Sequence, residues 1–198
     1  TGVAVEYDGV GSGLGVQRAM SEAYDFACTD APLTDAQLRE AAAVRGEVAH
    51  VPLVFGAVVP TYHLPDVRDP VRFTGAVLAD IYLGRVTRWT DPALVAANPR
   101  AALPDRPIAV VRRADSSGST YIWTDYLSKK SPAEFGRRVG AATLPVWPPG
   151  PDGAAFGTAA RGSDGVAEAV ARTIGAIGYV EMTYALEHRL PVGGVKNR

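Results

Sequence analysis

The sequence predicts an α/β fold, because strand-like and helix-like segments alternate along its 198 residues. The expected helices start at capping residues and carry apolar side chains at helical spacing. A hydrophobic fraction of 47% beside 21% charged residues is typical of a chain that buries a core, and it argues against disorder. This length suits one large domain or two small lobes.

In the first part of the chain we expect a strand, a turn and two helices. Residues 3–7 alternate apolar side chains with polar or small ones, as a strand does. Residues 9–15 are predicted to form a glycine-rich turn, followed by a short helix through Met20. Thr34 and Gln37 have the spacing of a capping box, and the helix behind them has an apolar face.

The middle of the chain combines an extended segment with several helix starts. Residues 48–62 are predicted to be extended. Within them, the apolar run 51–59 is expected to be a buried strand, since a membrane span needs about 20 apolar residues. Thr74 can cap a helix that Gly84 ends. Proline at the first helical position predicts two more helices, which start at Pro92 and Pro132.

The last part of the chain repeats the alternation of strand and helix. Residues 108–111 and 176–180 are predicted strands. A helix between them is expected to be capped by Ser163 or Asp164. Residues 145–157, rich in proline and glycine, are predicted to be a loop.

Residues 110–120 carry the strongest functional signal. A short apolar strand runs into Arg113, Asp115 and a cluster of hydroxyls, and a helix opens at Gly118. A helix start presents unpaired N–H groups and a positive dipole end, and an arginine fork matches a tetrahedral oxyanion. Asp115 either holds the arginine in place or accepts a proton from an anion that still carries one. A polar turn with a capping serine is the alternative interpretation.

The glycine-rich turn at residues 9–15 lacks the signature of a nucleotide-binding loop. Its glycines are spaced by two, so the G-x-G-x-x-G pattern fails, and no Gly-Lys-Ser/Thr follows. Either the turn is purely structural, or its N–H groups and the Ser12 hydroxyl approach a small anion closely. Asp30 has the same two interpretations, as a turn aspartate before Pro32 or as a carboxylate at an anion site.

Composition and motif content exclude several classes of protein. The formal net charge of −1 gives no basic footprint for nucleic acid. The three histidines lack metal-ligand spacing, and neither a G-x-S-x-G nor an H-E-x-x-H pattern is present. A hydrolase that uses Ser117 as its nucleophile would need a neighbouring base, and only a distant histidine could supply it. We therefore expect a binding protein with no cofactor and no metal, not an enzyme.

Five segments, in this order, resemble the motifs of one protein family. They are residues 7–13, 25–33, 80–89, 112–120 and 175–181. Together they resemble the periplasmic phosphate-binding proteins that feed ATP-driven phosphate importers. The likeness covers essentially the whole chain, and five ordered motifs are far more specific than any one of them.

The resemblance implies a periplasmic-binding-protein type II-like fold, in which two lobes close on the ligand around a hinged cleft. Residues 1–62 would form a partial first lobe and residues 63–190 the second lobe. Residues 191–198 would start a crossover that returns to the first lobe. Phosphate would bridge the cleft and lose its water when the lobes close, so that its oxygens need many donors.

The resemblance also implies the ligand-binding residues. On the first lobe they are Ser12 and Asp30, and on the second lobe they are Arg113, Asp115, Ser117, Gly118 and Ser119. The carboxylate that matches Asp30 accepts the hydrogen of HPO4²⁻ or H2PO4⁻. Sulfate carries no proton at neutral pH, and the missing hydrogen bond, worth about 1–3 kcal/mol, favours phosphate at least roughly tenfold.

Partners and location follow from the same resemblance. The expected partners are inorganic phosphate and the membrane permease of an ABC importer, and we expect a monomer. Cys28, the only cysteine, lies in an apolar strand context and is predicted to be a small buried thiol, which leaves the compartment open. The family implies a periplasmic or extracellular protein, with a lipid anchor at the outer face of the cell membrane as one form.

The sequence departs from the family pattern at both ends. Family members begin with a further strand and a phosphate-contacting loop, and they continue past the region that matches residues 195–197. We therefore expect a first lobe that is completed by missing segments or by another chain. Two alternatives to transport remain: a phosphate-sensing or interaction module with the same pocket, and a relic lobe that binds nothing. Sequence upstream of Thr1 would discriminate between them.

Overall fold

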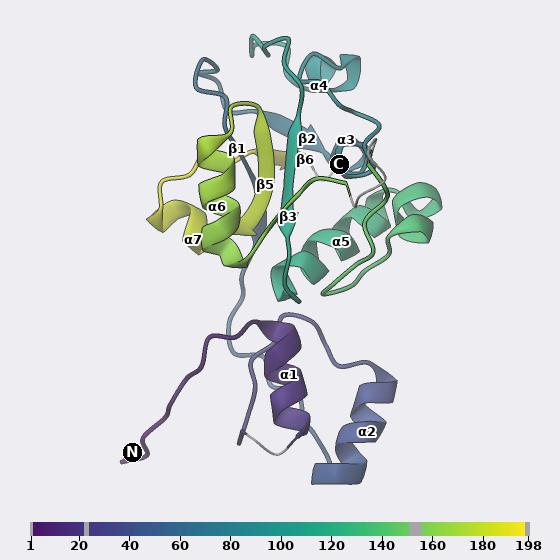
Figure 1. Cartoon of the computed structure of the whole chain (residues 1–198), viewed down its shortest axis with the longest axis vertical. Coiled ribbons are helices and arrows are strands. Elements are labelled where there is room, and N and C mark those ends of the chain that lie inside the picture. The colour runs from purple at the N-terminus through teal and green to yellow at the C-terminus, as the bar shows by residue number, and fades with distance from the viewer. Residues whose placement is uncertain (1, 22–23, 151–155, 197–198) are drawn as a thin grey trace.

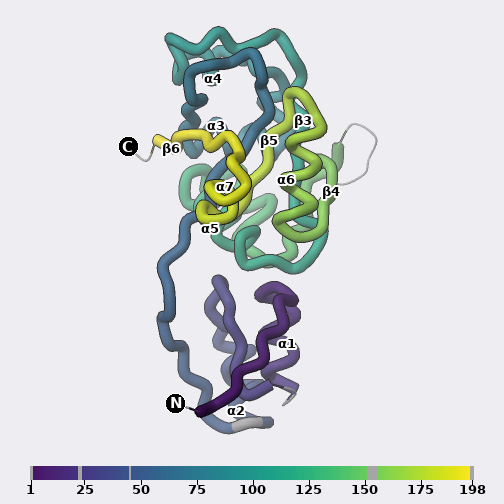
Figure 2. Tube along the Cα trace, turned by 90° about the vertical axis from the view of Figure 1, so that its left-hand side faces the viewer, coloured from purple at the N-terminus to yellow at the C-terminus, as the bar shows by residue number. Residues whose placement is uncertain are grey.

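The computed structural model describes residues 2–21, 24–150 and 156–196, and its elements form two groups (Figure 1). The first group holds two helices, α1 (Ser12–Met20) and α2 (Asp35–Arg45). Residues 47–57, without helix or strand, lead to the second group along one side of the molecule (Figure 2). Residue 1, residues 151–155 of the predicted loop and residues 197–198 of the predicted crossover lie outside the described ranges.

A mixed sheet forms the centre of the second group, with strand order β1-β5-β3-β4. Strand β3 runs parallel to both β5 and β4, whereas β1 runs antiparallel to β5. The four strands are β1 (Val58–Tyr62), β3 (Ala109–Arg113), β4 (Thr158–Ala160) and β5 (Ala176–Glu181). A second, two-stranded parallel sheet pairs β2 (Arg72–Thr74) with β6 (Gly194–Lys196).

Helices cover both faces of the four-stranded sheet. Neighbouring residues of β3, Val110 and Val111, belong to two different apolar clusters, because successive side chains of a strand point to opposite faces. Helices α6 and α7 lie over one face and α3 and α5 over the other (Figure 1). The helices of this group are α3 (Gly75–Tyr82), α4 (Pro92–Ala97), α5 (Gly118–Lys130), α6 (Gly162–Arg172) and α7 (Met182–Glu187), with a π-helical turn η1 (Pro132–Gly136).

An aromatic cluster fills the core on the α5 side of the sheet. The ring of Tyr179, on β5, stacks on Trp123 of α5 with 5.2 Å between ring centroids and 15° between planes. Tyr82 packs against both rings and against Trp147. Trp89 lies in a second set of rings with Tyr62 and Phe73. All three tryptophans of the chain are therefore buried in the second group.

The structure confirms the α/β class and the main capping predictions. Thr34 and Gln37 form both hydrogen bonds of a capping box at the start of α2. The Thr74 hydroxyl accepts from the Val77 N–H and caps α3, and Gly84 follows that helix with φ +72°. The helix start at Pro92 is confirmed, and Pro132 opens the π-helical turn.

Several predictions for the first group are wrong. Residues 3–7 form no strand, because no segment of the described chain pairs with them. The predicted buried strand at 51–59 is a strand only from Val58, and Leu53 and Phe55 are exposed. Cys28 is exposed and lies outside any strand. Alternation and apolar runs predict strands only where a neighbouring strand is available to pair with them.

Two helix starts also differ from the prediction. Helix α1 begins at Ser12, inside the expected glycine turn, because Gly11 takes φ +81° and ends the extended segment there. Helix α6 begins at Gly162, so that Ser163 and Asp164 lie within its first turn instead of capping it. The carboxylate of Asp164 accepts from the Tyr184 hydroxyl instead.

The predicted lobe boundary falls inside a secondary-structure pairing. Residues 58–62, which the prediction places in the first lobe, pair along their whole length with β5 of the second group. Strand β6, in the predicted crossover, pairs with β2. The division into lobes otherwise stays a prediction. No helix in the described ranges has the length and apolar character that crossing a membrane requires.

Candidate functional site

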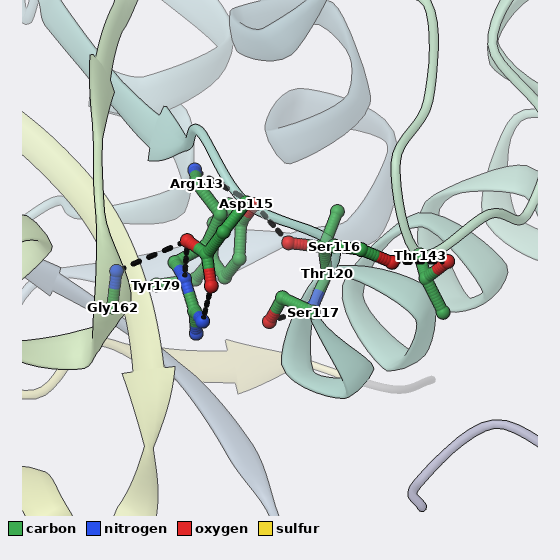
Figure 3. Close-up of polar contacts among 8 residues, drawn as sticks. All are labelled: Arg113, Asp115, Ser116, Ser117, Thr120, Thr143, Gly162 and Tyr179. Atoms are coloured by element: carbon green, nitrogen blue, oxygen red, sulfur yellow. Dashed lines mark hydrogen bonds and ion pairs between the residues drawn. The ribbon is translucent and has the colours of Figure 1, made fainter. Parts of the chain in front are cut away.

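The site begins where strand β3 ends, at Arg113. This side chain is 9% exposed, and it lies against the carboxylate of Asp115 (Figure 3). The Arg113 Nε–H donates to Asp115 Oδ1 at 2.9 Å, and its Nη2 donates to Oδ2. This two-point contact fixes the plane of the guanidinium. Arg112, the preceding residue, points elsewhere and donates from Nε to the Phe156 carbonyl at 2.9 Å.

Asp115 holds the arginine and is itself held by helix α6. The backbone N–H of Gly162, the first residue of α6, donates to Asp115 Oδ1 at 3.0 Å. Gly162 has φ +69°, a conformation that favours glycine. The Arg113 guanidinium lowers the pKa of Asp115 to about 2, so the carboxyl stays ionised at neutral pH. Of the two interpretations of Asp115, this geometry favours the one in which it holds the arginine fork.

The start of helix α5 supplies the next donors. Ser117 is the N-cap residue, and its hydroxyl accepts from the Thr120 N–H at 3.3 Å. The Ser117 N–H donates to the Thr143 carbonyl at 2.9 Å, which fixes the loop before the helix. The N–H groups of Gly118 and Ser119, in the first turn, have no acceptor among the described residues. A helix start with free donors and the positive dipole end is suited to an anion.

Helix α1 meets this position from the first group. Its first residue, Ser12, is buried, and its hydroxyl accepts from the Asp30 N–H at 3.2 Å. A Cβ added to Gly118 would overlap Asp30 Oδ2 and Ser12 Oγ, so these three residues are in close proximity. A Cβ added to Gly13 would likewise overlap the Ser116 hydroxyl. The N-termini of α1 and α5 therefore face each other across the boundary between the two groups.

The predicted ligand set is brought together by this arrangement. Arg113, Asp115 and Ser117 lie along one wall, and Ser12 and Asp30 lie against Gly118 from the other wall. Ser119 follows Gly118 in the first turn of α5. The hydroxyls of Ser12 and Ser117 each accept a backbone N–H, which leaves the proton of each hydroxyl free to be donated to a ligand.

The comparisons with known proteins identify the family of the chain. The profile of the PBP superfamily domain matches residues 1–194. The chain belongs to this superfamily. A protein named "Phosphate-binding protein PstS" from Xylella fastidiosa (strain 9a5c) is 37% identical over 198 residues, which cover 100% of this chain and 51% of that protein. One of the same name from Methanocaldococcus jannaschii is 36% identical, covering 99% of this chain and 50% of that protein.

Solved structures of the PBP superfamily confirm the fold that the resemblance implied. A human phosphate-binding apolipoprotein matches with a TM-score of 0.78 and 27% identity, covering 98% of this chain and 56% of that one. A high-affinity periplasmic phosphate-binding protein bound with phosphate matches with a TM-score of 0.75 and 24% identity, covering 100% of this chain and 57% of that one. The chain thus spans about half the length of the curated relatives it matches.

Sequence reasoning missed the residues that support the site of this PBP-superfamily chain. Thr143 holds the loop before α5, both through its carbonyl and through its hydroxyl, which accepts from Ser116 Oγ at 3.0 Å. Gly162 and Tyr179 hold the arginine and its partner. Tyr179 lies in one of the five family-like motifs, but these contacts join residues far apart in the sequence, and no local spacing reveals them.

The described residues around Ser117 lack the partners that a catalytic nucleophile or a metal ion would need. Ser117 Oγ accepts the Thr120 N–H at the start of α5, and no histidine in the described ranges hydrogen-bonds to it. A metal site would need a group of at least three histidine, cysteine or acidic side chains, and the described part of the chain contains none. What the site can offer a ligand is a set of donors and two carboxylates.

Proposed function

We propose that this chain binds inorganic phosphate between the N-termini of helices α1 and α5. The observation that carries the proposal is the convergence of two helix starts on one position, beside the fixed guanidinium of Arg113. Each helix start adds unpaired N–H groups and a partial positive charge, and Arg113 adds a full one. All the proposed ligand residues come from one chain, which supports a monomer.

The carboxylate of Asp30 specifies which anion suits the site. Asp30 lies against Gly118, where the ligand would meet the first turn of α5. A bare anion such as sulfate would present lone pairs to this carboxylate, whereas HPO4²⁻ or H2PO4⁻ can donate a hydrogen to it. Asp115 does not play this part, because Arg113 and Gly162 already occupy its oxygens. A protonated oxyanion is therefore the ligand that satisfies every group.

We further propose that the chain serves transport, as part of a substrate-binding protein that delivers phosphate to an ABC importer outside the cytoplasmic membrane. The support is the similarity to proteins named for phosphate binding, at 36–37% identity over nearly the whole chain. The role is binding without chemical conversion of the ligand. A lipid anchor is compatible with this location.

The first group of elements supports a further part of the proposal, its completion by additional polypeptide. Seven apolar side chains of this group and of the connection after it are strongly exposed: Val3, Val5, Tyr7, Val51, Leu53, Val54 and Phe55. A soluble protein seldom leaves so many large apolar groups in water on one small unit. In the second group, by contrast, the sheet faces are covered by helices.

Titration calorimetry on the protein tests the ligand assignment. We expect phosphate and arsenate to bind, and sulfate to bind at least about tenfold more weakly, because the Asp30 carboxylate would lack a proton to accept. In Asp30→Asn the amide can donate to a bare oxygen, so the affinity for sulfate should rise relative to the affinity for phosphate. Equal affinity of the unmodified protein for sulfate and phosphate would contradict the proposal. The matched control is Asp35→Asn, at the exposed start of α2, which should keep the preference.

A further inference from the structure

The hydroxyl of Tyr179 joins the two elements that carry the donors of the site. Tyr179 lies on β5 and is 1% exposed. Its hydroxyl oxygen accepts from the backbone N–H of Arg113 at 3.3 Å. The same hydroxyl shares a hydrogen bond of 2.8 Å with Oγ1 of Thr120, in the first turn of α5. One buried oxygen therefore contacts both the end of β3 and the start of α5 (Figure 3).

The protonation of this tyrosine fits a bridging role. Burial raises the pKa of Tyr179, so its hydroxyl is neutral at physiological pH. It accepts from the Arg113 N–H with its lone pairs, and its own proton can go to Thr120 Oγ1. The ring cannot move away easily, because it stacks on Trp123 of α5 and packs against Tyr82.

The loop between β3 and α5 has no regular structure that would by itself fix the distance between these two elements. Residues 114–117 join Arg113 to the first residue of α5 without regular hydrogen bonding. Thr143 ties Ser116 and Ser117, and Gly162 ties Asp115. Tyr179 contacts Arg113 and the helix itself. An oxyanion that bridges the guanidinium and the helix N–H groups needs their separation fixed to within a fraction of an ångström.

We infer that Tyr179 is a positioning residue of the anion site, which sets Arg113 at a fixed distance from the first turn of α5. The inference rests on the proposed function for its ligand. Tyr179 itself stays in the core behind the donors and acts through them. Its effect on binding is therefore separable from its share in the packing of the aromatic cluster.

Tyr82 provides a matched control for this separation. It belongs to the same ring cluster, is fully buried, and donates from its hydroxyl to the Val111 carbonyl at 3.4 Å. Val111 lies on β3, two residues before Arg113. Tyr82→Phe therefore removes the same chemical group from the same core, together with a hydrogen bond to the same strand, but it leaves the hydrogen bonds of Arg113 and of the first turn of α5 in place.

Calorimetric titration of the intact protein with phosphate compares the two variants. We expect Tyr179→Phe to lose about tenfold in affinity, since one hydrogen bond to each donor element is removed. Tyr82→Phe should stay within about twofold of the unmodified protein, although the two variants lose similar thermal stability. In an Arg113→Ala background, Tyr179→Phe should cost little further affinity. Equal losses in the two single variants, or unchanged affinity in Tyr179→Phe, would overturn the inference.

A measurement without phosphate separates this inference from the proposed function. Solvent exchange of the Arg113 Nε–H, followed by ¹⁵N NMR in the ligand-free protein, reports how firmly the guanidinium is held against Asp115. We expect exchange to be at least about tenfold faster in Tyr179→Phe and unchanged in Tyr82→Phe. Unchanged exchange in Tyr179→Phe refutes the positioning role. If exchange is faster in Tyr179→Phe but the unmodified protein does not bind phosphate, the positioning role of Tyr179 is supported and the ligand assignment is refuted.

Discussion

One guanidinium, that of Arg113, has to serve two partners at once. Asp115 occupies the side edge of the fork, formed by Nε and Nη2. The end of the fork, with the Nη1 protons, remains to face a ligand. The carboxylate therefore keeps the cation from swinging and also selects which of its edges an anion can meet. Because Asp115 offsets much of the positive charge of Arg113, and the protein carries a net charge of only −1, the site has to bind an anion through locally placed donors and not through a broad positive field.

Removing this fork is the sharpest test at the residue scale. Arg113→Ala should lose at least about a hundredfold in phosphate affinity, because a bidentate charged contact disappears and Asp115 faces the anion unpaired. Arg113→Lys should recover only part of the loss, since an ammonium cannot reproduce the fork. Calorimetric titration measures both variants.

The neighbouring arginine is the control for that experiment. Arg112 donates to the Phe156 carbonyl, on the other side of the strand from the site. Arg112→Ala should therefore bind phosphate nearly normally. Loss of binding in Arg112→Ala together with normal binding in Arg113→Ala would show that the assigned register of the site is wrong by one residue.

The ionised state of Asp115 has a consequence for stability at low pH. Its pKa falls from an ordinary 3.8 to about 2 in the folded protein, chiefly through the Arg113 hydrogen bonds. A lowered pKa means that the ionised carboxylate stabilises the fold above about pH 4, and that this contribution is lost as the pH falls toward 2. Allowing for partial exposure, we expect about 1–2 kcal/mol.

Urea unfolding at a series of pH values measures this contribution. Asp115→Asn should flatten the decline of the unfolding free energy between about pH 4 and pH 2 and should lower stability at neutral pH. Asp125→Asn, which removes an exposed ion pair with Lys129, is the control and should keep the decline of the unmodified protein. An unchanged decline in Asp115→Asn would show that Asp115 contributes nothing to acid stability.

At the scale of elements, the site is a meeting of two helix starts, and only one was foreseen from the sequence. The capping serine at Ser117 and the run of helical residues after it predict α5 correctly. The sequence predicts helix α1 after the glycine turn, but the helix starts at Ser12, inside that turn. Glycine permits both a turn and a tight helix entry, so the choice depends on what the chain meets, here the Ser116 loop.

The other features that the sequence does not predict depend on contacts between segments that are far apart in the chain. The alternation at residues 3–7 and the apolar run before Val58 carry strand patterns without a strand partner in the described chain. Cys28 is exposed for the same reason, because its predicted burial requires a surrounding sheet. The supports at Thr143, Gly162 and Tyr179 are long-range contacts, which local spacing does not reveal.

Gly118 allows the contact between the two helix starts to be tested directly. Alanine favours a helix over glycine by up to about 1 kcal/mol, so Gly118→Ala should keep or raise thermal stability of the helix. Its added methyl would nevertheless overlap Asp30 Oδ2 and Ser12 Oγ. We therefore expect a strong loss of phosphate affinity, measured by calorimetry, without a loss of secondary structure by circular dichroism.

Gly165→Ala is the matched control, because Gly165 lies inside helix α6 and a Cβ there meets only ordinary contacts with Ala160 at 3.5 Å. The Gly165→Ala variant should gain similar helix stability, and its affinity for phosphate should be unchanged. Normal phosphate binding by Gly118→Ala would show that the first group does not close on α5 as described.

The burial of apolar side chains differs between the parts of the molecule. The second group has two apolar clusters beneath its helices. Residues 51–55 of the connection, in contrast, are exposed, with Phe55 100% exposed. The two groups therefore differ in local stability, and the connection between them should be the first region to be cleaved.

Limited digestion with chymotrypsin tests whether the connection is the least stable region. We expect early cleavage after Leu53 or Phe55, with the second group surviving as one fragment identified by mass spectrometry. According to the proposal that additional polypeptide covers the first group, a form that includes this polypeptide should resist cleavage there. Early cleavage of that longer form at the same bonds would contradict the proposal that this surface is covered.

The burial of every tryptophan in the second group decides which optical signals can report on ligand binding. Trp123 stacks on Tyr179, whose hydroxyl contacts the Arg113 backbone, so tryptophan fluorescence senses the second-group side of the site only. The first group contains no tryptophan, so tryptophan emission does not report its movement directly. The exposed thiol of Cys28, the single cysteine of the chain, belongs to the first group and can carry an acceptor dye. Energy transfer from the tryptophans to this dye would follow closure of the two walls as a distance, separately from ligand contact.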